Sequence, residues 1–135
     1  MTSQEKKEML WKAGRGDKLL SRLYAKVDNL YEQAIRMTAQ WGSEKVKGGK
    51  GEGMEGILVR LADELTELSK QQSAYFELVR NVQHAIESLP SHKQREVITY
   101  RYFDGLKWEE IADRMGTELT SVYKLHGRAL QNLKF

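Results

Sequence analysis

The stretch 106–125 constrains the fold of this chain most strongly, because its small and apolar residues have the spacing of two short crossing helices. Ile111 and Ala112 share one face of the first helix, and Val122 lies on the inner face of the second. Helices that cross at roughly 90–120° over a short turn need a small side chain where they meet, which Ala112 supplies. Gly116 supplies a turn residue that tolerates a positive φ. The pattern predicts a helix-turn-helix.

The second of these helices has one face without acidic side chains. If Val122, Leu125 and Ala129 point inward, the opposite face is left exposed at 100° per residue. No aspartate or glutamate occurs over 119–135, whereas three basic residues do. Such a face suits an element that enters the major groove of DNA. The predicted DNA-contacting residues are Lys107, Leu119, Thr120, Ser121, Tyr123, Lys124, Gly127 and Arg128.

Individual roles follow from side-chain chemistry. Lys124 can donate to guanine O6 or N7, and the hydroxyls of Thr120 and Ser121 can bond a base edge or a phosphate. Lys107 stands where a helix-capping residue is expected but cannot accept backbone N–H bonds; we interpret it as a phosphate contact, with a solvated lysine as the alternative. Gly127 permits a close approach of the duplex to the backbone, with a neutral surface glycine as the alternative.

The boundaries of the preceding helix are marked in the sequence. Pro90 cannot continue a helix, and Ser91 with Gln94 predicts a capping box for the next one. Asp104 and Gly105 are typical of its end. Over 79–135, these signals predict three short helices that form one helix-turn-helix domain.

Several linked motifs in this domain resemble region 4 of sigma-70 family factors. They comprise Leu89-Pro90, Arg95-Glu96-Val97, Tyr100-Arg101-Tyr102-Phe103-Asp104-Gly105-Leu106, Trp108-Glu109-Glu110-Ile111-Ala112, Met115-Gly116, Val122 and Arg128-Ala129-Leu130. The resemblance implies a domain that holds a promoter element in the major groove and docks on the flap of RNA polymerase. No counterpart of the promoter-melting region is visible in the first half. The arrangement is therefore more similar to phage-encoded late-gene regulators of the ArpU and RinA type.

The resemblance does not extend to the DNA sequence that is read. In sigma factors the early turn of the recognition helix is usually rich in arginine and glutamate, whereas here it reads Glu118-Leu119-Thr120-Ser121. The target site, the regulated genes and the choice between activation and repression are therefore left open.

Upstream of Pro90 the apolar residues alternate at three- and four-residue intervals, which predicts long helices. One series, interrupted by a glutamine at position 72, runs Leu58, Leu61, Leu65, Leu68, Gln72, Tyr75, Val79, Val82, Ile86 and Leu89; the other runs Leu20, Leu23, Val27, Leu30, Ala34, Met37 and Trp41. Each helix can cover the other, so we predict an antiparallel hairpin or coiled coil over 18–78. Residues 1–17 form an N-terminal segment, in which Met9, Leu10 and Trp11 suggest a docking element.

Glycine and charged residues dominate 42–56, which contains six glycines and almost no apolar side chain. Such a segment cannot bury enough surface to offset its backbone entropy, so it is interpreted as a flexible linker. A linker of this length permits the helices to pair within one chain or between chains. A homodimer is compatible with a helix-turn-helix that reads two half-sites.

Composition excludes several classes of protein. The chain of 135 residues has no cysteine, which rules out disulfides, and no run approaches the roughly 18 apolar residues of a membrane span. No catalytic or metal-ligand spacing is present, so we expect neither an enzyme nor a cofactor or metal. The sequence predicts a cytoplasmic all-α regulator that binds double-stranded DNA. The alternatives are an RNA-polymerase-docking adaptor without sequence-specific DNA binding and a phage DNA-packaging recognition subunit.

Overall fold

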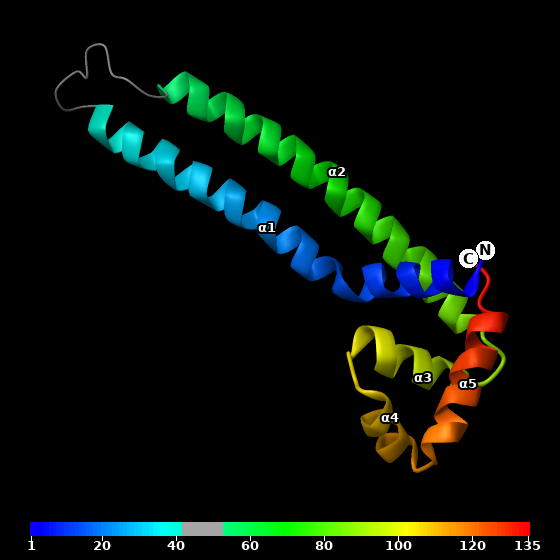
Figure 1. The fold of residues 1–135 in the computed structure, drawn as a ribbon. Helices are drawn as coiled ribbons and strands as arrows, with labels where there is room; N and C mark the ends of the chain where they lie inside the picture. Colours follow the sequence, from blue (N-terminus) through cyan, green and yellow to red (C-terminus); the bar gives the residue numbers. More distant parts are fainter. Residues whose placement is uncertain (42–52) are drawn as a thin grey trace. The chain divides into compact units, whose positions relative to one another are not determined.

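The computed structural model describes residues 1–41 and 53–135, without the side chain of Trp41. In this part of the chain every regular element is helical, as predicted, and no strand occurs (Figure 1). The elements are α1 (Ser3–Trp41), α2 (Met54–Glu87), α3 (His92–Ile98), the π-helix η1 (Thr99–Phe103), α4 (Trp108–Met115) and α5 (Leu119–Asn132). None of the described helices has both the length and the apolarity that a membrane span requires.

The chain divides into two compact units, which are described separately. Unit 1 comprises Met1–Gly16 and Ala74–Phe135, and unit 2 comprises Asp17–Ser73. The sequence predicts a separate segment over 1–17 and a last domain that begins at residue 79. In the structure the first turns of α1 belong to the same compact unit as α3, α4 and α5.

The core of unit 1 combines residues from both of its segments. Leu10 and Ala13 of α1 are buried together with side chains from every other helix of the unit. The rest of this core consists of Val82, Ala85, Ile86, Leu89, Val97, Ile98, Tyr102, Ile111, Ala112, Val122, Ala129, Leu130 and Leu133. Leu10, one of the three residues that suggested a docking element, is thus a core residue, and the domain buries more apolar surface with the α1 turns than without them.

Two glycines allow α1 to lie against its neighbours in unit 1. A Cβ on Gly14 would lie 1.9 Å from the carbonyl oxygen of Tyr102, and one on Gly16 would lie 1.7 Å from the ring of Tyr75. The hydroxyl of Tyr75 donates to the carbonyl oxygen of Ala13 at 2.9 Å. These positions therefore need glycine because of close approach rather than because of an unusual backbone conformation.

The helix that follows Pro90 begins and ends where the sequence predicted. Ser91 caps α3, and its hydroxyl accepts from the backbone N–H of Gln94 at 3.1 Å. Only this half of the predicted capping box forms, because the side-chain oxygen of Gln94 accepts instead from the amide of Asn132 on α5. The chain continues directly from α3 into the π-helix η1. Gly105, with a φ of 69°, lies just beyond the end of η1.

Unit 2 consists of parts of α1 and α2 that lie side by side, as the predicted hairpin requires (Figure 1). On α1 the buried residues are Leu20, Leu23, Leu30 and Ala34, all members of the predicted seam. Gln72 of α2 donates its side-chain amide to the hydroxyl of Tyr24 of α1. The glutamine that interrupts the apolar series is therefore partnered within one chain.

The predicted seam is wrong on α2 at two of its members. Leu58 and Leu65 are 49% and 47% exposed, whereas Ile57, which lies outside the predicted series, is buried. The predicted members Leu68, Val82 and Ile86 are buried, as the series requires. The apolar stripe of α2 is wider than one seam, and α1 packs against the edge that contains Ile57. An ideal helix also drifts by about 20° per heptad relative to a strict seven-residue repeat. A second apolar row is left on the surface of unit 2.

The predicted linker lies mostly outside the described residues. Of the stretch 42–56, only 53–56 is described, and α2 already begins at Met54. The end of the linker was therefore placed too far along the chain, because Gly56 is tolerated in the first turn of the helix.

Candidate nucleic-acid interface

The turn between α4 and α5 has the geometry that the sequence predicted. Gly116 ends α4 in the left-handed conformation, with a φ of 63°, and its backbone N–H donates to the carbonyl of Asp113. The N–H of Thr117 donates to the carbonyl of Ala112 at 3.0 Å. These two bonds satisfy carbonyls at the end of α4, a common arrangement at glycine-terminated helices. Glu118 then starts α5 from an extended conformation.

Core packing fixes which side of α5 faces outward. Val122, Ala129 and Leu133 are fully buried, and Leu130 is nearly so. Eight polar, glycine or aromatic residues on the remaining surface of α5 are exposed: Thr120, Ser121, Tyr123, Lys124, Gly127, Arg128, Gln131 and Asn132. Leu119, at the start of α5, is half-buried. The structure thus leaves the predicted face of α5 accessible.

A basic groove runs along one flank of this face. It has a volume of about 300 Å³ and is lined by Lys93, Met115, Thr117, Ser121, Lys124, Leu125 and Arg128. Three of these residues are cationic and none is acidic, so the groove is suited to an anionic strand. Lys93, which is on α3, is not among the predicted contacts, because a lysine two residues after a helix cap carries no signal of its own.

An aromatic contact stiffens the other flank. The rings of Tyr123 and Trp108 meet edge to face with centroids 5.3 Å apart. The guanidinium carbon of Arg101 lies 4.4 Å from the centroid of the Trp108 ring, and Arg101 also donates to the carbonyl of Leu106 at 3.1 Å. Arg101 was quoted in the family resemblance but not as a site residue, and the structure adds it to this flank.

Lys107 occupies the start of α4 without capping it. Its side chain is exposed, and the reverse bond forms instead, from the backbone N–H of Lys107 to the carboxylate of Glu110 at 3.1 Å. The carboxylates of Glu109 and Glu110 lie in the first turn, where the helix dipole favours negative charge. Glu109 and Glu110 therefore stabilise the start of α4 in place of a side-chain cap, and the Lys107 ammonium group has no structural role in the cap.

A buried histidine holds α5 against η1. The Nε2 atom of His126 lies 2.8 Å from the hydroxyl of Tyr102, and the Trp108 ring meets the imidazole edge-on at 4.7 Å. Burial, followed by the charges of Lys7 and Arg101, lowers the pKa of His126 to about 4. Burial also raises the pKa of Tyr102 to about 12. Both groups are therefore neutral at neutral pH and form a structural hydrogen bond.

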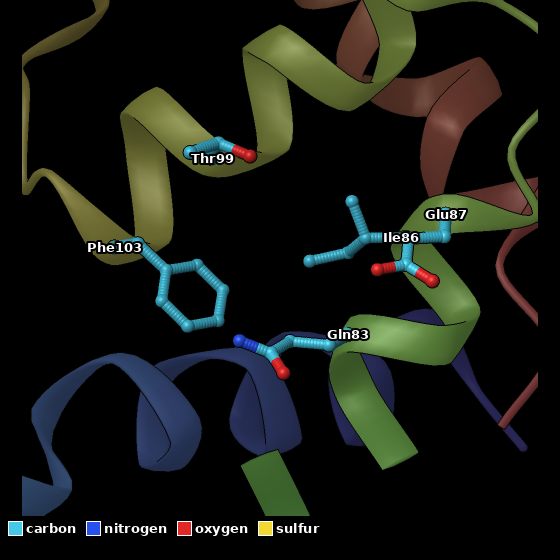
Figure 2. Close-up of a pocket in the computed structure, with 5 residues that line it drawn as sticks. All are labelled: Gln83, Ile86, Glu87, Thr99 and Phe103. Carbon is cyan, nitrogen blue, oxygen red and sulfur yellow. The ribbon is translucent and has the colours of Figure 1, made fainter. Parts of the chain in front are cut away.

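Unit 1 has a second hollow, away from the basic groove. It has a volume of about 320 Å³ and lies between α2 and η1, lined by Gln83, Ile86, Glu87, Thr99 and Phe103. Figure 2 shows Ile86 and Phe103 pointing toward each other from opposite walls, with the amide of Gln83 below the ring. Its two apolar side chains, Ile86 and Phe103, and its single carboxylate make it unlike the basic groove.

Comparison with known proteins connects this geometry to one family. Residues 79–133 match the family model described as Sigma-70, region 4. No match was found among curated proteins or among solved structures. The C-terminal part of the chain therefore contains a sigma-factor-like helix-turn-helix domain, as the resemblance of its motifs predicted.

Proposed function

We propose that this protein is a sequence-specific DNA-binding transcriptional regulator that reads promoter DNA with α5. The observation that carries the proposal is the face of α5, which is exposed and free of acid and adjoins the basic groove lined by Lys93, Lys124 and Arg128. In domains of this kind the second helix of the motif lies in the major groove with its first turns at the base edges. The match to a sigma-70 region 4 model supports this placement.

Within this proposal Lys124 is the principal base-reading residue. It lies in the middle of the exposed face, and its ammonium group can donate to guanine. Lys93 and Arg128 line the same groove and are assigned to phosphate groups, which position the helix without reading sequence.

A footprint on promoter DNA tests the assignment. Wild-type protein is expected to protect one short duplex segment, and Lys124→Ala to abolish that protection while thermal unfolding is unchanged. Lys134→Ala is the matched control, because Lys134 carries the same charge and is exposed but follows the end of α5. Equal protection by wild type and Lys124→Ala would remove α5 from the reading of DNA.

The hollow between α2 and η1 favours a second function, docking on RNA polymerase. Its apolar residues Ile86 and Phe103 can receive an apolar side chain of a partner, and Glu87 stands beside them. Glu87→Lys is expected to weaken retention of core polymerase, whereas Glu77→Lys, an equivalent change elsewhere on α2, is expected not to. An adaptor that only docks would keep polymerase with Lys124→Ala and would bind DNA fragments indifferently.

We infer that two copies of the chain associate through unit 2. The row left on its surface includes Leu58 and Leu65, and a groove of about 460 Å³ beside it is lined by Tyr31, Ala34, Ile35, Thr38, Ala39, Leu58 and Leu61. None of the described residues that line this groove is charged, so it suits an equally uncharged surface such as its own copy. Two hairpins packed face to face would make a four-helix bundle, whose core a single hairpin lacks.

Neighbouring residues provide a matched test of this association. Leu58 and Val59 are both about half exposed, at 49% and 55%, but at 100° per residue only Leu58 is directed into the groove. Leu58→Glu is expected to give a monomer in sedimentation at concentrations where wild type and Val59→Glu are dimers. A wild-type monomer well above micromolar concentration would exclude the dimer, and a ring-sized assembly would favour the packaging subunit.

The narrower resemblance to late-gene regulators leads us to propose a phage or prophage promoter as the target. A helical first half joined to a terminal region 4-like domain supports this hypothesis. Chromatin mapping in a lysogenic host is expected to place the protein upstream of late phage genes, and occupancy confined to host housekeeping promoters would contradict it.

A further inference from the structure

A row of aromatic rings and arginines extends from α5 across unit 1 to the first turns of α1. Its members, in order, are Tyr123, Trp108, Arg101, Trp11 and Arg15. Arg101 lies between the two indoles, 4.4 Å from the Trp108 centroid and 5.4 Å from that of Trp11. The guanidinium carbon of Arg15 lies 4.2 Å from the centroid of the Trp11 ring. We call these five residues the arginine–aromatic row.

The arginines of this row are not ion-paired with any carboxylate of the described residues. Within residues 1–41 and 53–135, no carboxylate forms an ion pair with Arg15, Arg101 or the nearby Lys7. Lys7, Trp11 and Arg15 follow one another at four-residue intervals on α1, so they share one face of that helix. Three uncompensated cations within one compact unit form a surface for an anion.

Stacking leaves the arginines able to bind that anion. A guanidinium group that rests on an indole face uses its flat side, and its N–H donors remain on the edges. Arg15 is exposed, and one N–H group of Arg101 is taken by the carbonyl of Leu106. The indoles therefore orient the guanidinium groups without consuming most of their donors.

The position of the row identifies the anion as DNA backbone. Trp108 is the first residue of α4, and in helix-turn-helix proteins the first helix of the motif crosses the phosphate backbone. Four steps of between 4.2 and 5.4 Å separate Tyr123 from Arg15, so the row reaches no more than about 20 Å from α5. At about 3.4 Å per phosphate along one strand, that distance covers roughly five or six phosphates.

We propose that the first turns of α1, through Arg15 and Lys7, form a second phosphate-binding surface that extends the contact with the duplex read by α5. This inference rests on the proposed DNA binding but concerns residues outside the region-4 match, which begins at residue 79. The α1 turns then have two roles, completing the core of unit 1 through Leu10 and lengthening its footprint.

The test compares the salt dependence of binding to a duplex that the wild type protects. Arg15→Gln is expected to reduce the slope of log affinity against log salt by about 0.9, which amounts to an affinity loss of about eightfold at 0.1 M salt relative to 1 M. The protected bases are expected to stay the same. Lys12→Gln is the matched control, because it removes an equal exposed charge from the same turns of α1 without touching the row.

A second variant and a second duplex separate this role from folding. Arg15→Lys keeps the charge and is expected to keep the wild-type slope. Trimming the duplex by about six base pairs beyond the protected segment, at each end in turn, is expected to weaken the wild type at one end only and to leave Arg15→Gln unaffected.

The outcomes distinguish this inference from the function on which it rests. Equal slopes for Arg15→Gln and Lys12→Gln, with wild type still bound and Lys124→Ala still defective, would overturn the α1 surface alone. A wild-type protein that binds no duplex would overturn both. A lower slope for Arg15→Gln together with the dependence on one flank supports the proposal.

Discussion

Replacing Gly14 with alanine is expected to destabilise unit 1, whereas the same change at Gly127 is expected to stabilise it. The new methyl group at position 14 would lie 1.9 Å from the backbone carbonyl oxygen of Tyr102, which cannot rotate away as a side chain can. At position 127 no heavy atom lies within 4 Å of the added carbon. Both residues are in helices, so the two variants differ only in what surrounds the methyl group.

The magnitudes follow from two opposing effects. Overpacking a well-packed core costs about 1–3 kcal/mol. Alanine in a helix interior is favoured over glycine by about 1 kcal/mol, which offsets part of that cost at position 14 and acts alone at position 127. We therefore expect the free energy of unfolding to fall by up to about 2 kcal/mol in Gly14→Ala and to rise by up to about 1 kcal/mol in Gly127→Ala.

Urea unfolding measures both changes. In a Trp41→Phe background, tryptophan fluorescence comes from Trp11 and Trp108, both in unit 1, so the transition reports on that unit. The midpoint is expected to move down for Gly14→Ala and up for Gly127→Ala. A Gly14→Ala protein at least as stable as wild type, with an unchanged near-ultraviolet spectrum, would refute the close packing of α1 on η1.

Four further changes test other contacts. The pKa of His126 is lowered from 6.5 in the unfolded chain to about 4 in the fold, so the free energy of unfolding is expected to fall as the pH drops through that interval. Urea titration is expected to show a smaller fall in His126→Gln. Tyr102→Phe removes the partner of that ring and is expected to cost about 1–3 kcal/mol in the same assay. Lys6→Met removes a 2.7 Å bond to the carbonyl of Leu130 and is expected to cost about 1 kcal/mol, seen as faster amide exchange at the end of α5. Lys107→Ser is expected to lower the salt slope of DNA binding by about 0.9, and an unchanged slope would make Lys107 a solvated lysine.

The helix-turn-helix was predictable because its signals are local. Gly116, Ala112 and the three- and four-residue spacing on α5 each specify backbone geometry within a few residues, and the structure confirms them. The exposure of Lys124 followed from the same periodicity. These features depend little on the remainder of the chain.

Contacts between distant segments were not predictable in the same way. Nothing next to Gly14 indicates that the carbonyl of Tyr102 will lie against it, and Lys93 joins the groove only because α3 and α5 pack together. The Tyr102–His126 bond likewise joins residues 24 positions apart. On α2, two adjacent apolar edges were available, and packing against α1, rather than the pattern, selected Ile57 over Leu58.

The most direct test of the proposed reading of DNA is the selection of bound sequences from a random duplex pool. Wild type and Lys124→Ala are compared in parallel, each with and without core polymerase. Wild type alone is expected to enrich one short motif, and Lys124→Ala to lose the preference at one or two of its positions. If wild type and Lys124→Ala enrich the same motif, or if no motif emerges under either condition, α5 does not read promoter DNA.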